Sequence, residues 1–467
     1  MGISHLDLNE IIALGLKKGA EYIDVRYQES YYELVTYDTG NLREYSTSRI
    51  IGIGIRVLVN GFMGFSSTNV LSKEAIEEAI NKAISCARAS SIAGRKRSLI
   101  EVPIIKDKVT STYRINPIDI DPENKVKLVS EVNKESLKRE RIKSTITRLG
   151  CQVDKRIFAS SEGSYVEVKV TSIGFGHMSV ARIGNVMERV HDSKSAIAGY
   201  EFIEKGDWLQ FAEEIDKLAA KAVEAKTPPA GSYPVVLDNR VVGLLLHEAF
   251  GHAAEADHIE AGASVLIGKL GERVASPLVT IVDEGIVEGG YFIPYDDEGV
   301  PKKRTVIVEK GVLKSYLYDR HTAKVLNGKP TGNARAQDYA SIPLVRQTNF
   351  YMLPGDYKVE ELFEDIDFGI YARSIGAGGG EVNTSMGTFT FNMGPSYIIR
   401  KGEIHELVRG VTLSGMILET LKEVDAVAND LKVTTSVFGG CGKNGQMVRV
   451  GDGGPHIRVR RMIIGGK

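Results

Sequence analysis

The chain has 467 residues, of which 43% are hydrophobic and 25% charged, a composition typical of a globular protein with two or three domains. Its formal net charge of −1 at pH 7 excludes a general electrostatic attraction to nucleic acid or anionic lipid. No apolar run reaches the roughly eighteen residues of a membrane span, so we expect neither a nucleic-acid nor a membrane partner. Three scattered cysteines are too few for a disulfide framework and predict a reducing, cytoplasmic location.

The first half of the chain alternates between helical and strand-like patterns, which predicts an α+β domain. Asn60-Gly61, between two strand-like runs, is a strong signal for a two-residue hairpin turn. Ser72 precedes an amphipathic stretch and is expected to cap its N-terminus. Three long alternating stretches favour an antiparallel sheet. The expected helices are 7–19, 72–90, 122–140 and 207–225, and the expected strands are 22–37, the hairpin 50–68, 143–157, 164–180 and 182–202.

A segment rich in proline and glycine, KTPPAGSYP (226–234), is the strongest domain boundary in the sequence. We expect an N-terminal α/β-sandwich-like domain with an antiparallel sheet over 1–228, which a connector near 107–118 could subdivide. A β-rich C-terminal domain is expected over 229–467. Its expected helices are 239–257, 320–327 and 413–428, and its expected strands include 279–285, 305–318 and 396–408.

The motif HEAFGH (247–252) places two histidines five residues apart, with Glu248 directly after the first. In a regular α-helix this spacing rotates the side chains of His247 and His252 about 140° apart. A π-bulge would return both imidazoles to one face, and Gly251 allows the backbone to bend there. The spacing therefore predicts a distorted helix that could present both rings to one metal ion. The alternative is that both histidines are ordinary packed or surface residues.

A catalytic zinc site normally has three protein ligands, so the two histidines need a partner. Glu255, Asp257 and His258 are close in the sequence, whereas Cys441 lies far away in a glycine-lined turn, FGGCGKNGQ (438–446). Thiolate is a strong zinc ligand, although a turn cysteine without a role is the alternative. Glu255 and Asp257 could instead accept the second imidazole N–H of His252 and orient its ring, or lie in solvent at a helix end.

Several motifs resemble the TldD branch of the TldD/PmbA family of zinc peptidases. The two most specific are HEAFGHAAEAD (247–257) and GGCGKNGQ (439–446). The other branch of the family lacks the histidine motif, so the chain resembles the metal-bearing subunit. The resemblance covers essentially the whole chain through RVLVNGFMGFSST (56–68), DDEGVP (296–301), PTGNARAQ (330–337), PLVRQTNFYMLPGD (343–356), FGIYARSIGAGGGEVNTSMGTFTF (368–391) and AVANDL (426–431).

This resemblance implies a zinc metallopeptidase that hydrolyses unfolded peptides or small proteins. It matches His247, His252 and Cys441 with the metal ligands and Glu248 with the catalytic glutamate. Thiolate and imidazole ligands favour Zn²⁺, and Glu248 would take the proton of a water bound to the metal. The resemblance also implies a homodimer or a heterodimer with a metal-free paralogue.

Two other functions fit the same residues. One is a different zinc amide hydrolase, and the other is a non-catalytic scaffold or binding subunit with a structural metal, whose coordination would be closed. A strand over 380–394 could bind a substrate backbone along its edge or be an ordinary internal strand. Arg346, Asn349 and the N–H groups of 376–380 are candidates for stabilising the carbonyl oxygen.

Overall fold

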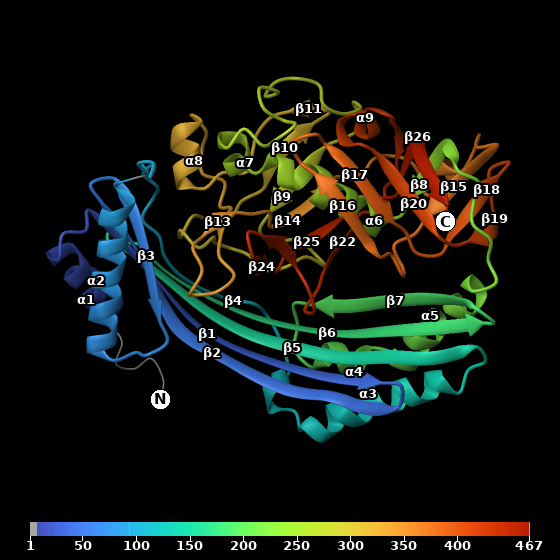
Figure 1. Cartoon of the computed structure of the whole chain (residues 1–467), viewed down its shortest axis with the longest axis horizontal. Coiled ribbons are helices and arrows are strands. Elements are labelled where there is room, and N and C mark those ends of the chain that lie inside the picture. The colour runs from blue at the N-terminus through green and yellow to red at the C-terminus, as the bar shows by residue number, and fades with distance from the viewer. Residues whose placement is uncertain (1–6, 93, 467) are drawn as a thin grey trace.

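The structure, a computed structural model, describes residues 7–92 and 94–466. One long, curved sheet occupies the first half of the chain, and a β-rich region formed by the second half lies on its concave side (Figure 1). The segment KTPPAGSYP (226–234) follows the last helix of the first region and contains the first four residues of the first strand of the second. The predicted α+β fold class is confirmed. No helix in the described part of the chain combines the length and apolarity needed to cross a bilayer.

The long sheet has seven strands in the order β3-β2-β1-β5-β6-β4, with β7 also paired to β6. Every pair is antiparallel except β4 with β6, which is parallel. Asn60 and Gly61 form the predicted turn, with φ of 53° and 78°, the left-handed conformation that a two-residue hairpin requires. The strands are β1 (Tyr22–Asp38), β2 (Asn41–Val59), β3 (Phe62–Thr68), β4 (Lys106–Thr110), β5 (Ile142–Ser160), β6 (Tyr165–Ile183) and β7 (Val186–Ala196).

Helices cover the convex face of this sheet in two groups (Figure 1). Two helices pack against β1, β2 and β3 at one end, and Ser72 caps the second by accepting the N–H of Ala75. The others pack at the opposite end, where Phe175 of β6 stacks on Trp208, with ring centroids 4.6 Å apart. The helices are α1 (Leu8–Lys17), α2 (Lys73–Ser90), α3 (Pro122–Leu137), α4 (Glu201–Lys205) and α5 (Trp208–Ala222), with a 3-10 turn η1 (Pro117–Asp119).

The second region contains two larger sheets around one hydrophobic core. The nine-stranded sheet has the order β16-β17-β20-β26-β8-β15-β18-β19, with β21 also paired to β26, and the six-stranded sheet has the order β11-β10-β9-β14-β25-β22. The strands of the first are β8 (Gly231–Leu237), β15 (Phe368–Ala372), β16 (Gly379–Asn383), β17 (Thr388–Asn392), β18 (Ser396–Arg400), β19 (Glu403–Val408), β20 (Val411–Met416), β21 (Val424–Val427) and β26 (Ile457–Gly466). Those of the second are β9 (Ile281–Glu284), β10 (Thr305–Glu309), β11 (Val312–Leu313), β14 (Asn349–Met352), β22 (Lys432–Thr435) and β25 (Gly451–Gly454).

Two short strand pairs and several short helices complete this region. The core between the sheets surrounds α6 and the segment after it, including the fully buried Val242, Leu246 and Phe250. The remaining elements are β12 (Ala334–Arg335), β13 (Leu344–Val345), β23 (Cys441–Lys443), β24 (Gln446–Val448), α6 (Asn239–Leu244), η2 (Leu245–Gly251), η3 (His252–Ala254), α7 (Ala256–Glu260), α8 (Arg320–Val325), α9 (Ile417–Lys422) and η4 (Glu360–Leu362).

Two elements of this region differ from the sequence prediction. The helix expected over 413–428 is wrong: β20 ends at Met416, only α9 is helical, and β21 follows. Short apolar runs do not distinguish helix from strand, and pairing with β17 and β26 decides the outcome. The single strand expected over 380–394 is a hairpin of β16 and β17, because Gly387, with φ of 71°, turns the chain.

Candidate metal centre

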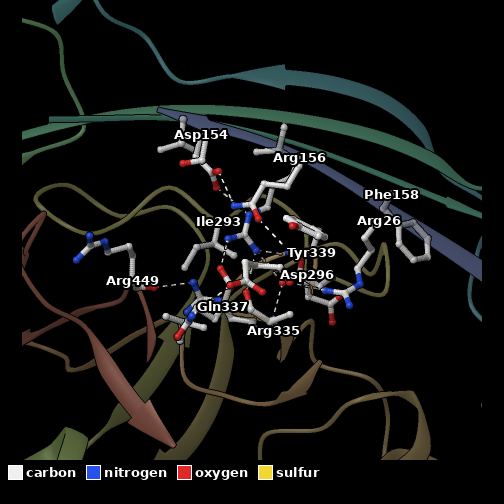
Figure 2. A pocket seen from close by; sticks show the side chains of 18 of the residues that line it. Arg26, Asp154, Arg156, Phe158, Ile293, Asp296, Arg335, Gln337, Tyr339 and Arg449 are labelled. Carbon is white, nitrogen blue, oxygen red and sulfur yellow. Dashed lines mark hydrogen bonds and ion pairs between the residues drawn. The ribbon is translucent and has the colours of Figure 1, made fainter. Parts of the chain in front are cut away.

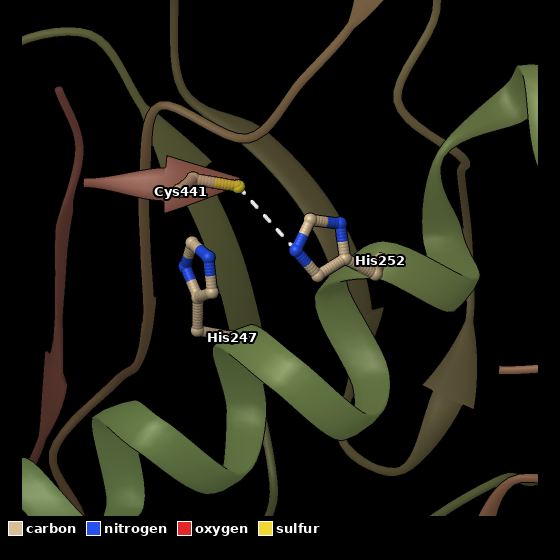
Figure 3. Close-up of side chains that lie close together, drawn as sticks. All are labelled: His247, His252 and Cys441. Atoms are coloured by element: carbon tan, nitrogen blue, oxygen red, sulfur yellow. Dashed lines mark hydrogen bonds between the residues drawn. The ribbon is translucent and has the colours of Figure 1, made fainter. Parts of the chain in front are cut away.

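The helix that carries the HEAFGH motif is irregular, as its spacing predicts. Asp238 caps α6 by accepting the N–H groups of Arg240 and Val241 at 3.1 and 2.8 Å. The chain continues as the π-helical segment η2, then the 3-10 turn η3. The wider π turn adds one residue between the two histidines, so both rings lie on the same side of the helix (Figure 3). The predicted distortion is confirmed.

Three potential ligand atoms converge beside this segment. His247, His252 and Cys441 are all buried, and their ligand atoms lie within 4.8 Å of one another. Sγ of Cys441 is 3.3 Å from Nε2 of His252, and the two imidazole centroids are 5.2 Å apart. A tetrahedral zinc ion with ordinary bond lengths spaces its nitrogen and sulfur donors about 3.3–3.6 Å apart. The described side chains therefore fit a metal ion with only small movements.

The surroundings of Cys441 favour the thiolate that a metal requires. Burial opposes ionisation of the thiol, but the charges of His247 and His252 and their hydrogen bonds outweigh it and lower the pKa of Cys441 to about 5. In addition, Nδ1 of His247 is buried without a hydrogen-bond partner among the described residues. A buried polar atom without a partner is costly, so this donor set suits a cation that such groups would coordinate.

A carboxylate behind His252 sets the orientation of its ring. Nδ1 of His252 lies 3.0 Å from Oε2 of Glu255, which is fully buried, so Nε2 faces Cys441. This is the role predicted for Glu255, and such contacts fix the imidazole tautomer. Asp257 has different contacts: its Oδ1 accepts from Nζ of Lys443 at 2.7 Å and from the backbone N–H of His258 at 3.0 Å, and not from an imidazole ring.

Lys443 holds this carboxylate in place, and the sequence prediction assigned it no role. Its Nζ donates to Glu255 at 2.8 Å, to Asp257 at 2.7 Å and to the carbonyl of Val345 at 3.0 Å. The sequence contained an indication of this role. Cys441 and Lys443 are two residues apart on β23, and side chains at that spacing share one face of a strand. The ammonium also explains why Glu255, Asp257 and His258, which lie close together, need no metal of their own.

Gln347 supports the other histidine. Its side-chain amide donates to the carbonyl of His247 at 3.0 Å, and its backbone N–H donates to Glu255 at 3.3 Å. A Cβ at Gly251 would lie 2.0 Å from Oε1 of Gln347, so a side chain there would displace this amide. Glycine is thus required at position 251 because the side chain of Gln347 approaches its backbone closely, in addition to the irregular helix there.

The candidates for stabilising the carbonyl oxygen have structural contacts instead. Arg346 is fully buried and donates to the carbonyls of Cys441 and Gln446. The amide of Asn349 donates to the carbonyls of Glu284, Gly285 and Tyr291. In the glycine run, the N–H groups of residues 376 and 378 bind backbone carbonyls. Arg346 therefore positions the β23–β24 hairpin that carries Cys441.

We expect Lys443→Met to lower the free energy of unfolding by about 3–5 kcal/mol, because the buried carboxylate of Glu255 would lose its positive partner. Chemical denaturation of the metal-loaded protein measures the change. The control is Lys314→Met, since Lys314 pairs with Glu309 on the surface, where an ion pair contributes less than about 1 kcal/mol. Equal losses for the two variants would contradict the supporting role of Lys443.

Two buried imidazoles, a thiol and an adjacent glutamate are the side chains used by metal-dependent hydrolases. Three family profiles match the chain in succession: PmbA/TldA metallopeptidase domain 1 at residues 23–87, the central domain at 115–225 and the C-terminal domain at 230–466. The chain belongs to the PmbA/TldD family and is a metallopeptidase, as its motifs predict.

Relatives agree with this assignment, and a solved structure shares the fold. A protein named Metalloprotease from Methanothermobacter thermautotrophicus is 38% identical over 97% of this chain and 98% of its own length. A Zinc metalloprotease TldD homolog from Saccharolobus solfataricus is 33% identical over 96% of this chain and 97% of its own. The crystal structure of TldE from Thermococcus kodakarensis has the same fold, with a TM-score of 0.77 at 19% identity, and the match covers 98% of this chain and 99% of that one.

Proposed function

We propose that the chain is a zinc-dependent peptidase in which His247, His252 and Cys441 hold the metal and Glu248 is the general base. The convergence of the three donor atoms within 4.8 Å, with Glu248 next to His247 on the π-helical segment, carries this proposal. A zinc ion bound by these residues would acidify a water molecule and polarise the scissile carbonyl group. Three protein ligands leave a fourth position open, which favours catalysis over a structural role.

Glu248 is suited to moving the proton. Its side chain is partly exposed, and its carboxylate accepts no hydrogen bond from the described residues, so it is free to contact a water molecule. Burial lowers the pKa of His247, but the charge and the hydrogen bond of Cys441 outweigh burial and raise this pKa, and the charge of Glu248 adds to the rise. In the proposed reaction Glu248 takes a proton from the attacking water and gives it to the leaving amine nitrogen.

The supporting residues keep the ligands in the required protonation states. Glu255 accepts the Nδ1 proton of His252 and so leaves the Nε2 lone pair directed toward Cys441. Lys443 balances the charge of Glu255, so the carboxylate stays ionised although it is buried. Gln347 holds the backbone at His247.

Removing the metal is the direct test of zinc dependence. Treatment with a chelator is expected to remove close to one metal ion per chain and to abolish cleavage of an unfolded peptide, and added Zn²⁺ is expected to restore it. Metal content and cleavage rate are measured on the same samples. Full cleavage by chain shown to be free of metal would overturn the proposal. Metal binding without any cleavage of unfolded peptides would favour the scaffold with a structural metal.

We also propose that unfolded peptides bind through main-chain hydrogen bonds to the edge of β16. This strand ends the nine-stranded sheet, has β17 as its single partner among the described strands, and lies next to η2. Its residues Gly380, Glu381 and Asn383 are exposed. An added strand binds any extended backbone and makes few demands on side chains, which suits unfolded substrates.

Peptides with methylated backbone nitrogens test this mode of binding. Each methyl group that blocks a strand hydrogen bond is expected to lower kcat/KM about 2- to 10-fold, the effect of losing one such bond. Methylation at alternate positions should matter most, because successive N–H groups of a strand point in opposite directions. A series in which every methylated peptide is cleaved as fast as its parent would contradict strand addition.

A further inference from the structure

A second cavity lies between the long sheet and the C-terminal region, with a volume of about 450 Å³ (Figure 2). Strands β1, β5 and β6 form one wall, and the segments 291–297 and 335–339 with β24 form the other. None of the residues of the metal centre lines it. Its size is that of a site for a small molecule or a short peptide.

Arg26 brings a buried positive charge into this cavity. Its side chain is 4% exposed and donates to the carbonyls of Asp338 and Ser341, but it forms no ion pair with a carboxylate in the described part of the chain. Its Nε is buried and has no hydrogen-bond partner among the described residues. Burial lowers the pKa of Arg26, and the charges of Asp297 and Asp24 oppose this effect without outweighing it.

Arg335 contributes a second such charge from the opposite wall. It is 7% exposed, and its guanidinium donates to the carbonyls of Gln347 and Arg449 at 2.7 and 2.6 Å. Like Arg26, it has no carboxylate within ion-pair distance among the described residues. Burial is the main cause that lowers the pKa of Arg335 to about 10.

The acidic groups of the cavity do not pair with Arg26 or Arg335. Asp154 and Asp297 pair with a third guanidinium, that of Arg156, at 2.8 and 3.3 Å. Burial and the charge of Glu298 raise the pKa of Asp296, and both oxygens of this carboxyl group accept backbone N–H groups, from Glu298, Val300 and Ala334. Asp338 is half-buried, and its carboxylate accepts hydrogen bonds from Ala340 and Ser341 of its own loop. Arg26 and Arg335 therefore line the cavity without a carboxylate partner among the described residues.

Another part of the lining is apolar. Phe158 and Val168 from the sheet face Ile293 and Phe292 from the C-terminal region, and Val448 closes one end. An apolar wall favours the burial of apolar side chains. It offers no hydrogen-bond partner to a strongly hydrated ion such as phosphate. The cavity thus combines an arginine side, defined by Arg26 and Arg335, with an apolar side.

We propose that this cavity binds the C-terminal carboxylate of a short apolar peptide. The carboxylate would receive charge-assisted hydrogen bonds on the arginine side, and the adjacent side chains would pack on the apolar side. We choose a peptide as the ligand because the chain is a peptidase. The proposal does not depend on Glu248 or on zinc.

The site shares a wall with the metal centre without being part of it. Val448, which lines the cavity, is paired with Cys441 across the β23–β24 hairpin, and the two side chains pack together. Arg335 binds the carbonyl of Gln347, whose amide binds the carbonyl of His247. A peptide end in the cavity would therefore lie behind the hairpin that carries Cys441.

Calorimetric titration with acetyl-alanyl-leucyl-phenylalanine and its C-terminal amide tests the proposal. The protein is the metal-loaded Glu248→Gln variant, so that the peptide is not cleaved and a failure of the catalytic proposal cannot affect the result. We expect the free acid to bind at least about tenfold more tightly than the amide. Arg26→Met in this background should remove the preference, whereas Arg400→Met, at a surface ion pair with Glu406, should keep it.

A second variant locates the binding site and guards against misfolding. Val168→Phe adds bulk to the apolar side and removes no hydrogen bond, so it should weaken binding of both peptides at least about tenfold. If Arg26→Met does not fold, the result for Val168→Phe decides whether the peptide binds in this cavity. Equal affinity for acid and amide overturns the proposal. Binding that Val168→Phe leaves unchanged also overturns it, because the peptide would then bind at the metal centre. A protein that binds inorganic phosphate but not the peptide would overturn it as well.

Discussion

Glu248→Gln is expected to lower kcat for peptide cleavage by about 10²- to 10⁴-fold, the usual contribution of a general base. Glutamine has nearly the same shape as glutamate but cannot accept a proton from water at neutral pH. Glu248 is not among the three converging ligand residues, so the metal content should stay at the wild-type level. The measurement pairs initial cleavage rates with metal analysis of the same preparation.

The matched control for this experiment is Glu272→Gln. Glu272 is an exposed glutamate that pairs with Lys269, and its replacement should change kcat less than about twofold. Loss of metal together with activity in Glu248→Gln would show that Glu248 holds the site together and would remove it from the role of base. Wild-type cleavage by Glu248→Gln would exclude it from the reaction.

Cys441→Ser is expected to weaken metal binding by more than about a hundredfold and to abolish cleavage at ordinary metal concentrations. Loss of a residue that only supports a ligand costs 10- to 100-fold, and loss of the ligand itself exceeds that range. The serine hydroxyl does not ionise near neutral pH, whereas His247 and His252 lower the pKa of the Cys441 thiol to about 5 despite its burial. Competition with a metal-sensitive dye measures the affinity.

Cys86→Ser is the control for this variant, because Cys86 is a free and exposed cysteine on α2 in the other region of the chain. It should keep wild-type affinity and activity. Unchanged metal affinity in Cys441→Ser would show that the third ligand is another group, and the proximity of Sγ to His252 would then be a packing contact.

Local patterns were sufficient for most elements of the first region. The turn at Asn60-Gly61 and the cap at Ser72 each depend on residues within a few positions, and a short window of sequence contains that information. The region over 413–428 was mistaken because its apolar residues satisfy both helical and strand periods, and only pairing with distant strands distinguishes them.

The sequence by itself determined the family, the distorted helix and the residues with the chemistry for a metal site. HEAFGH predicts the distorted helix because, over a single turn, the number of residues between two side chains fixes the angle between them. Only the tertiary structure decided that Cys441, 189 residues from His252, lies 3.3 Å from its ring, and that Lys443 and Gln347 hold the site. The tertiary structure also decided that Arg26 and Arg335, which are 309 residues apart in the sequence, line one cavity. Such contacts depend on how sheets pack across the whole chain, and no local pattern encodes them.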